Sequence, residues 1–320
     1  MVEMWLNAIH GWWNRLCSSL FPEPRGMSAS GRGSTPRVYG RLERVVLTDQ
    51  VCRSLFDGFA AHRRTARGDE EIGWVLLGVR DEREALALAT LPAGAHRDAG
   101  VAHVAFNHTA QAVASRIVRQ WDRRLQHLGV VHTHPGSLRH PSGGDFHGDS
   151  QWVANLRGGE GIFGIGTADA HGESSGCPGQ THLQVLGDLC FSWYVLGKGD
   201  GQYRKAPVEI ALGPDLARSL HPLWETLEHH AAPLERLGKQ LAGVVFETVR
   251  FEDQPALKVS MPAADAGKVL MILQGDEARF FFERGAEVTA IDPEEGPLDR
   301  AVFLILAEVA GQSARQMFSV

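Results

Sequence analysis

An apolar run that ends in two histidines is the stretch of this sequence best suited to chemistry. The run contains Leu128, Val130 and Val131, and the histidines are His132 and His134. Such a run predicts a buried strand. Because alternate residues of a strand project from the same face, both imidazoles are expected to point at one ion. A chance pair is common in a chain with 15 histidines, so the residues that follow must decide.

A serine and an aspartate follow the histidine pair at a spacing typical of a helix start. Pro135 ends the strand, a loop follows, and Ser142 precedes Asp145 by three residues. This spacing predicts a helix with Ser142 as its N-cap and Asp145 in its first turn. Two imidazoles and one carboxylate leave the fourth tetrahedral position of zinc for water, as in catalytic sites. The sequence therefore predicts a catalytic zinc centre whose ligands are His132, His134 and Asp145.

The same stretch resembles the JAMM (JAB1/MPN+) metalloproteases. Their signature is a glutamate, a long gap, His-x-His-Pro and then Ser-x-x-Asp, and the last two parts are residues 132–135 and 142–145. The resemblance implies an upstream glutamate at the head of an apolar strand, with a glycine seven residues later. Glu71 and Gly78 fit this spacing. We therefore expect Glu71 to be the general base.

Glu70 is the alternative to Glu71. The family usually has a second small residue three positions after its glutamate, which would be Gly73 for Glu70 but is Trp74 for Glu71. The spacing to Gly78 favours Glu71. The large side chain of Trp74 leaves the packing of this strand as a question for the structure.

Amide hydrolysis is the reaction that these groups would support. Zinc lowers the pKa of bound water to about 7 and polarises the carbonyl group under attack. Glu71 would accept the proton of that water and deliver it to the leaving amine. The resemblance gives Ser142 a second role as hydrogen-bond donor to the oxyanion, typically worth about a hundredfold or more in rate. A plain helix cap is the alternative for Ser142. Nearby His140, His147 and Asp149, which follows Asp145 at helical spacing, could orient a metal ligand, but solvated loop residues are the preferred prediction for them.

Length and composition indicate a two-domain globular protein. The chain has 320 residues, of which 43% are hydrophobic and 22% are charged. A net charge of −6 gives no reason to expect nucleic acid as a partner. The cysteines, Cys17, Cys52, Cys177 and Cys190, form no CxxC pair. They therefore suggest neither a disulfide framework nor a cysteine zinc site, and we expect a cytoplasmic protein.

Three parts of the chain differ in pattern. Residues 1–37 predict an amphipathic helix and a flexible linker, which would dock on this protein, on a partner or on a membrane surface. Residues 38–200 alternate between strand and helix patterns and predict a mixed α/β sheet. This pattern matches the JAB1/MPN-like (cytidine-deaminase-like) metalloprotease fold. Residues 201–320 predict an α+β accessory domain for recognition or for homo-oligomer formation.

The periodic segments give the expected elements. Strands are predicted at 38–47, 71–78, 85–90, 128–132, 162–167, 189–196, 208–212, 244–251, 257–261, 269–273 and 278–282. Helices are predicted at 48–63, 107–126, 216–227, 234–241 and 298–310, besides the one that Ser142 begins. Gly129 is expected to stop the helix at 107–126.

The resemblance implies a zinc-dependent peptidase or isopeptidase that cleaves after the C-terminal glycine of a ubiquitin-like protein. Its expected partners are that protein, its conjugates and cognate E1-like and E2-like proteins. The composition looks bacterial, which suggests an operon for ubiquitin-like modification in antiviral defence. The alternatives are a JAMM peptidase for sulfur-carrier proteins or small adducts, and a non-catalytic MPN scaffold. The complete ligand set counts against the scaffold, because scaffolds of this family typically lack it.

Overall fold

The computed structural model describes residues 39–94, 106–172, 175, 179–263, 267–293 and 296–317, with side chains up to residue 311. The predicted N-terminal helix and linker, as well as Cys17 and Cys177, lie outside the described residues. The described residues form two compact units. One comprises those of Met1–Gln111 and Asp122–Arg218, and the other comprises those of Ala112–Trp121 and Ser219–Val320.

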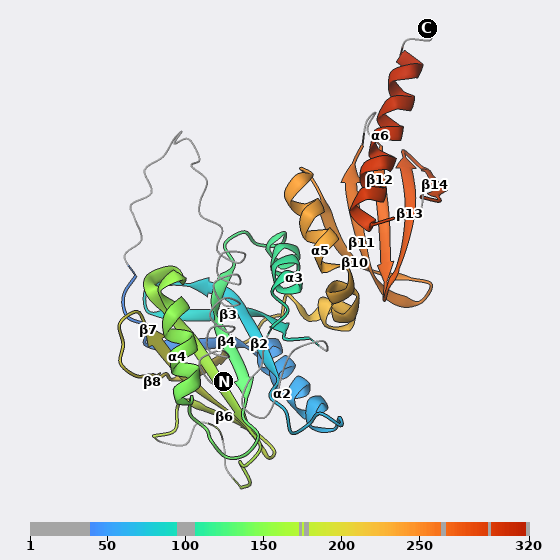
Figure 1. Ribbon diagram of the computed structural model, residues 1–320. Coiled ribbons are helices and arrows are strands. Elements are labelled where there is room, and N and C mark those ends of the chain that lie inside the picture. The colour runs from blue at the N-terminus through green and yellow to red at the C-terminus, as the bar shows by residue number, and fades with distance from the viewer. Residues whose placement is uncertain are drawn as a thin grey trace, which may run out of the picture. The chain divides into compact units, whose positions relative to one another are not determined.

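A mixed sheet of nine strands forms the first unit (Figure 1). The strand order is β6-β7-β5-β4-β2-β3-β1-β9, and β8 pairs with β7. The strands are β1 (Arg44–Thr48), β2 (Gly73–Arg80), β3 (Glu84–Pro92), β4 (Gln126–Thr133), β5 (Glu160–Thr167), β6 (Leu183–Leu186), β7 (Leu189–Gly197), β8 (Arg204–Lys205) and β9 (Val208–Ala211). The predicted mixed α/β class is confirmed. Parallel pairing of β9 with β1 extends this sheet beyond residue 200, the predicted domain boundary.

Helix α2 (Asp49–Arg63) packs its apolar face against the core of this unit. Its N-cap is Thr48, whose hydroxyl accepts the Val51 N–H at 3.2 Å. Trp74 is buried in the same core, where the family usually has a small residue. Gly58 of α2 provides the space, since a Cβ there would lie 2.9 Å from the Trp74 ring. A tryptophan on β2 is therefore compatible with Glu71 at the head of that strand.

The end of helix α3 (His108–Arg119) corrects one prediction. The helix was expected to reach residue 126 and to stop at Gly129, but β4 already begins at Gln126. Gly129 lies inside β4, where a Cβ would come 1.7 Å from the carbonyl oxygen of Ile162 on β5. Glycine is thus required for the close approach of two strands rather than for ending a helix.

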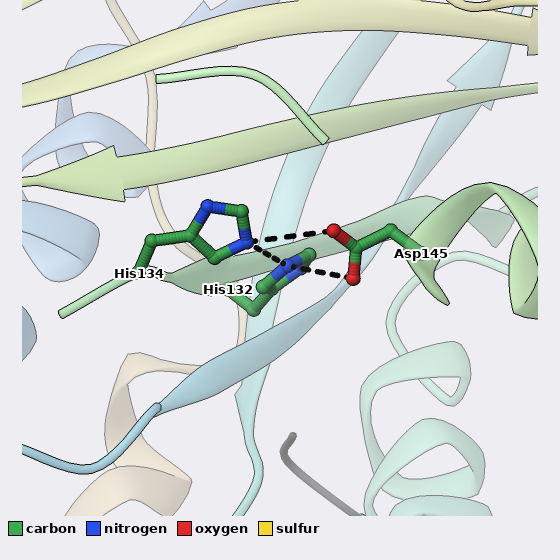
Figure 2. Close-up of side chains that lie close together, drawn as sticks. All are labelled: His132, His134 and Asp145. Atoms are coloured by element: carbon green, nitrogen blue, oxygen red, sulfur yellow. Dashed lines mark hydrogen bonds and ion pairs between the residues drawn. The ribbon is translucent and has the colours of Figure 1, made fainter. Parts of the chain in front are cut away.

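Strands β4 and β5 are parallel and are joined through helix α4 (Gly143–Trp152) and two short 3-10 turns, Val153–Asn155 and Arg157–Gly159. A crossover of this kind returns the chain to the start of the next strand, so its helix begins near the carboxyl end of the first. Figure 2 shows the consequence, with the end of β4 facing the first turn of α4. Residues 132–135 and residues 142–145 therefore meet at the carboxyl end of β4.

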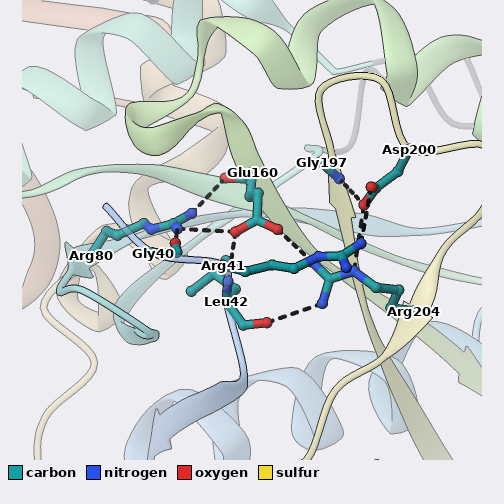
Figure 3. A network of polar contacts seen from close by, with 8 residues as sticks. All are labelled: Gly40, Arg41, Leu42, Arg80, Glu160, Gly197, Asp200 and Arg204. Carbon is teal, nitrogen blue, oxygen red and sulfur yellow. Dashed lines mark hydrogen bonds and ion pairs between the residues drawn. The ribbon is translucent and has the colours of Figure 1, made fainter. Parts of the chain in front are cut away.

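Glu160, the first residue of β5, lies at the centre of a polar network (Figure 3). Its carboxylate pairs with Arg204, lies 3.0 Å from Nη2 of Arg80, and accepts the backbone N–H of Leu42 at 2.6 Å. Arg80 also donates to the carbonyl oxygen of Gly40 at 2.6 Å, and its side chain is only 2% exposed. Because an unpaired buried charge is costly, this network ties distant segments of the chain to β5.

The second unit contains an antiparallel sheet in the order β10-β11-β12-β13-β14. Its strands are β10 (Val245–Phe251), β11 (Gln254–Pro262), β12 (Lys268–Gln274), β13 (Glu277–Arg284) and β14 (Glu287–Ile291), and its helices include α5 (Trp224–Gln240) after a 3-10 turn (Arg218–Leu223), and α6 (Leu298–Met317). The helices predicted at 216–227 and 234–241 are wrong as separate elements, because α5 continues through Pro233. Strand β14 was not predicted, since it has only five residues and they are mostly exposed. Among the described residues, no helix has the length and apolar character needed to cross a bilayer.

Replacing Glu160 with glutamine is expected to destabilise the first unit by about 3–5 kcal/mol, because Arg80 would remain buried without its counter-charge. Urea unfolding followed by circular dichroism measures this loss. Glu43→Gln is the matched control, since the ion pair of Glu43 with Arg83 has side chains 60% and 67% exposed. That variant should lose less than about 1 kcal/mol. An equal loss in the free energy of unfolding for the two variants would contradict the stabilising role of the buried network around Glu160.

Candidate metal centre

Three side chains converge between β4 and α4. Figure 2 shows His132, His134 and Asp145 facing one another. Nε2 of His132 lies 3.2 Å from Oδ1 of Asp145, Nε2 of His134 lies 3.4 Å from Oδ2, and the two Nε2 atoms are 3.0 Å apart. Both imidazoles are buried. Within the described part of the chain, this is the one group of three or more histidine, cysteine or acidic side chains arranged to hold a metal ion.

The nitrogen–oxygen separations of 3.2 Å and 3.4 Å match those of ligands around a tetrahedral zinc ion, whereas the 3.0 Å between the two nitrogens is shorter. Bonds of about 2.0–2.1 Å place neighbouring ligand atoms about 3.3–3.4 Å apart in tetrahedral geometry. Nδ1 of His134 lies 2.8 Å from the carbonyl oxygen of Leu138. A carbonyl only accepts, so Nδ1 carries the proton and Nε2 of the neutral ring is an acceptor. Because the lone pair of Nε2 faces the negatively charged carboxylate of Asp145, a cation is needed between these two groups. The three side chains are therefore suited to bind a metal ion.

The electrostatics of the centre follow from the same contacts. Burial favours neutral His132, but its hydrogen bond to Asp145 and the charge of that carboxylate prevail and raise the pKa of His132. Burial likewise opposes charge on Asp145, yet the hydrogen bond and positive charge of His132, together with the backbone N–H of Ser142, hold the pKa of Asp145 well below its usual range. In the metal-free protein, a proton on His132 thus supplies positive charge that the carboxylate needs.

A capping box fixes Asp145 at the start of α4, as predicted. The backbone N–H of Ser142 donates to Oδ2 of Asp145 at 2.6 Å, and the N–H of Asp145 donates to Oγ of Ser142 at 3.2 Å. The sequence left open whether Ser142 is a cap or a catalytic donor. A hydroxyl can accept one hydrogen bond and donate another, so the cap does not consume the proton of Ser142.

Glu71 and Glu70 point in different directions. Gly73 lies opposite His132 in the antiparallel pair of β2 and β4, and alternate residues share a face. Glu71 is therefore on the face of the histidines, where it is 5% exposed and its charge contributes to the raised pKa of His132. Glu70 instead accepts from Nε of Arg67 at 2.7 Å.

Asp149 is a buried carboxylate near the centre. The preferred prediction of a solvated loop residue is wrong, because Asp149 is 8% exposed and lies on α4, one turn after Asp145. Burial raises the pKa of Asp149 to about 7, although hydrogen bonds from Tyr203 and Trp152 oppose the shift. A metal ion nearby would oppose it further. The available signal was the spacing of four residues between two aspartates in a predicted helix. His140 and His147 are exposed, as expected.

Comparison with known proteins gives the family of this domain. Residues 53–177, which include the three candidate ligands, Glu71 and Ser142, match the family model of prokaryotic homologs of the JAB domain. Residues 53–177 form a domain of the JAB family. The family includes metallopeptidases. Among solved structures, the solution structure of a protein from Desulfitobacterium hafniense matches with 16% identity and a TM-score of 0.36, over 53% of this chain and 94% of that one. No curated protein matches the chain.

The capping box of the JAB domain can be tested through stability. Ser142→Ala should destabilise the metal-free domain by about 1 kcal/mol, whereas Ser142→Gly should cost only a few tenths, because glycine is tolerated as an N-cap. Urea unfolding in the presence of a chelator measures both. Ser137→Ala, in the exposed loop before the helix, is the control and should match the wild type. If Ser142→Ala is as stable as wild type, Ser142 does not cap α4.

Proposed function

We propose that this protein is a zinc-dependent peptidase or isopeptidase that cleaves the amide bond after the C-terminal glycine of a ubiquitin-like protein. The observation that supports this most is the convergence of His132, His134 and Asp145 with Glu71 on the same face of the sheet. A carboxylate beside a three-ligand centre is the combination that metal-assisted hydrolysis requires. Family members without activity would not need all four groups.

Each side chain has a separate task in this proposal. His132, His134 and Asp145 would hold zinc, which supplies a Lewis acid for water activation and carbonyl polarisation. Glu71 takes the proton from the attacking water and gives it to the nitrogen of the leaving amine. The hydroxyl of Ser142 donates to the carbonyl oxygen as negative charge develops there. Burial of both imidazoles strengthens these interactions, because the surroundings screen charge less than water does.

The substrate class rests on the resemblance of residues 132–145 to the JAMM signature. Glycine at the cleaved bond suits a site whose histidines are 8% and 7% exposed, because a residue without a side chain can approach buried ligands most closely. The prokaryotic character of the matched family supports a bacterial ubiquitin-like system, which we propose acts in antiviral defence. Its E1-like and E2-like proteins would then be further partners.

A bacterial ubiquitin-like protein with a short peptide fused after its terminal glycine is the substrate that tests this function. Wild-type protein should bind about one zinc per chain and release the peptide. Glu71→Gln should keep the zinc but lose at least about a hundredfold in kcat, because the proton acceptor is gone. Asp145→Ala should lose both zinc and activity. Mass spectrometry of the product and metal analysis of each variant provide the readouts.

Glu70→Gln is the matched control, because it removes the neighbouring carboxylate while leaving Glu71 in place. It should retain both zinc and activity. A wild-type protein that binds no zinc after reconstitution would contradict the proposed zinc-dependent peptidase activity and favour the non-catalytic scaffold. Zinc binding with cleavage of sulfur-carrier fusions or small amides, but not of the ubiquitin-like fusion, would contradict the substrate class alone.

A further inference from the structure

Helix α4 carries a metal-ligating carboxylate but buries few of its own side chains. Three of its ten residues, GGDFHGDSQW, are glycines, and its buried residues are Asp149 and Trp152. Helices in proteins are stabilised mainly by packing of an apolar face. A helix with one buried apolar side chain therefore depends on polar contacts for its position.

Tyr203, just before β8, contacts both α4 and the sheet, beside Trp152 of α4, which packs on Phe163 of β5. Its hydroxyl donates to Oδ2 of Asp149 at 2.8 Å, while Oδ1 accepts Nε1–H of Trp152 at 3.1 Å. The Tyr203 ring also lies edge-on to Phe146 of α4 and to Phe163 of β5, with centroids 5.9 Å and 5.5 Å apart. Tyr203 thus contacts the helix through both its ring and its hydroxyl.

The hydrogen bond of Tyr203 acts one helical turn from the ligand Asp145. A hydrogen bond to a carboxylate is strong and directional, particularly when it is buried. We propose that the bond between Tyr203 and Asp149 positions α4, so that the Asp145 carboxylate stays within reach of His132 and His134. Tyr203 is in this view a positioning residue. The inference rests on the metal centre of the proposed function.

Zinc affinity is the property that this positioning would change. Ordering of the ligand side chains on zinc binding costs entropy and lowers the zinc affinity. A protein in which Asp145 is already positioned therefore binds zinc more tightly. Groups that orient metal ligands typically contribute about 10- to 100-fold in affinity. Tyr203→Phe removes the hydroxyl but keeps the ring and leaves the Asp149 carboxyl in place. A loss of affinity in Tyr203→Phe would therefore report lost positioning.

Competition with a chromophoric chelator, using the full chain, measures the zinc dissociation constant. Tyr203→Phe should bind zinc about tenfold more weakly than wild type. Asp149→Ala should bind at least as weakly, because it removes the same hydrogen bond and also a negative charge. The double variant should be about as weak as Asp149→Ala alone, since both substitutions remove the hydrogen bond between Tyr203 and Asp149. Circular dichroism of each variant checks that the fold is retained.

Tyr39→Phe is the matched control, because it also removes one hydroxyl and its ring lies under the Arg80 guanidinium, 5.6 Å from the centroid. Its zinc affinity should equal that of wild type. Wild-type affinity in Tyr203→Phe would overturn the positioning role while leaving the metal centre and the proposed function intact. A wild type that binds no zinc would overturn both.

Discussion

The structure is built around two imidazoles and a carboxylate that lie together in a buried place. Two imidazole nitrogens and a carboxylate lie 3.0–3.4 Å from one another. Without a cation these groups repel one another, and burial increases the cost because the surroundings screen charge poorly. Asp145 raises the pKa of His132, and a proton on that imidazole offsets part of this cost. A bound cation would offset it too, so the arrangement suits a metal ion.

The fold imposes this convergence through elements that would not otherwise meet. The β4-α4-β5 crossover returns the helix to the end of β4, and pairing with β2 brings Glu71 to the same face. The capping box sets the direction of the Asp145 carboxylate. The network around Glu160 then holds β5 to distant segments of the first unit, so the scaffold is fixed by buried charge as well as by apolar packing.

Much of this arrangement could be predicted from the sequence, because it depends on short spacings. The alternation of His132 and His134, the cap spacing of Ser142 and Asp145, and the apolar strands all act within a few residues. What could not be predicted depends on residues far apart in the chain. Tyr203 contacts Asp149 across 54 positions. Gly129 faces Ile162 on a neighbouring strand, and its sequence context was equally typical of a helix stop.

X-ray absorption at the zinc edge of the zinc-loaded protein identifies the atoms bound to the ion without relying on activity. We expect four nitrogen or oxygen atoms at about 2.0–2.1 Å, with outer-shell scattering from two imidazoles. A sulfur shell at about 2.3 Å, or a first shell without imidazole scattering, would contradict this expectation.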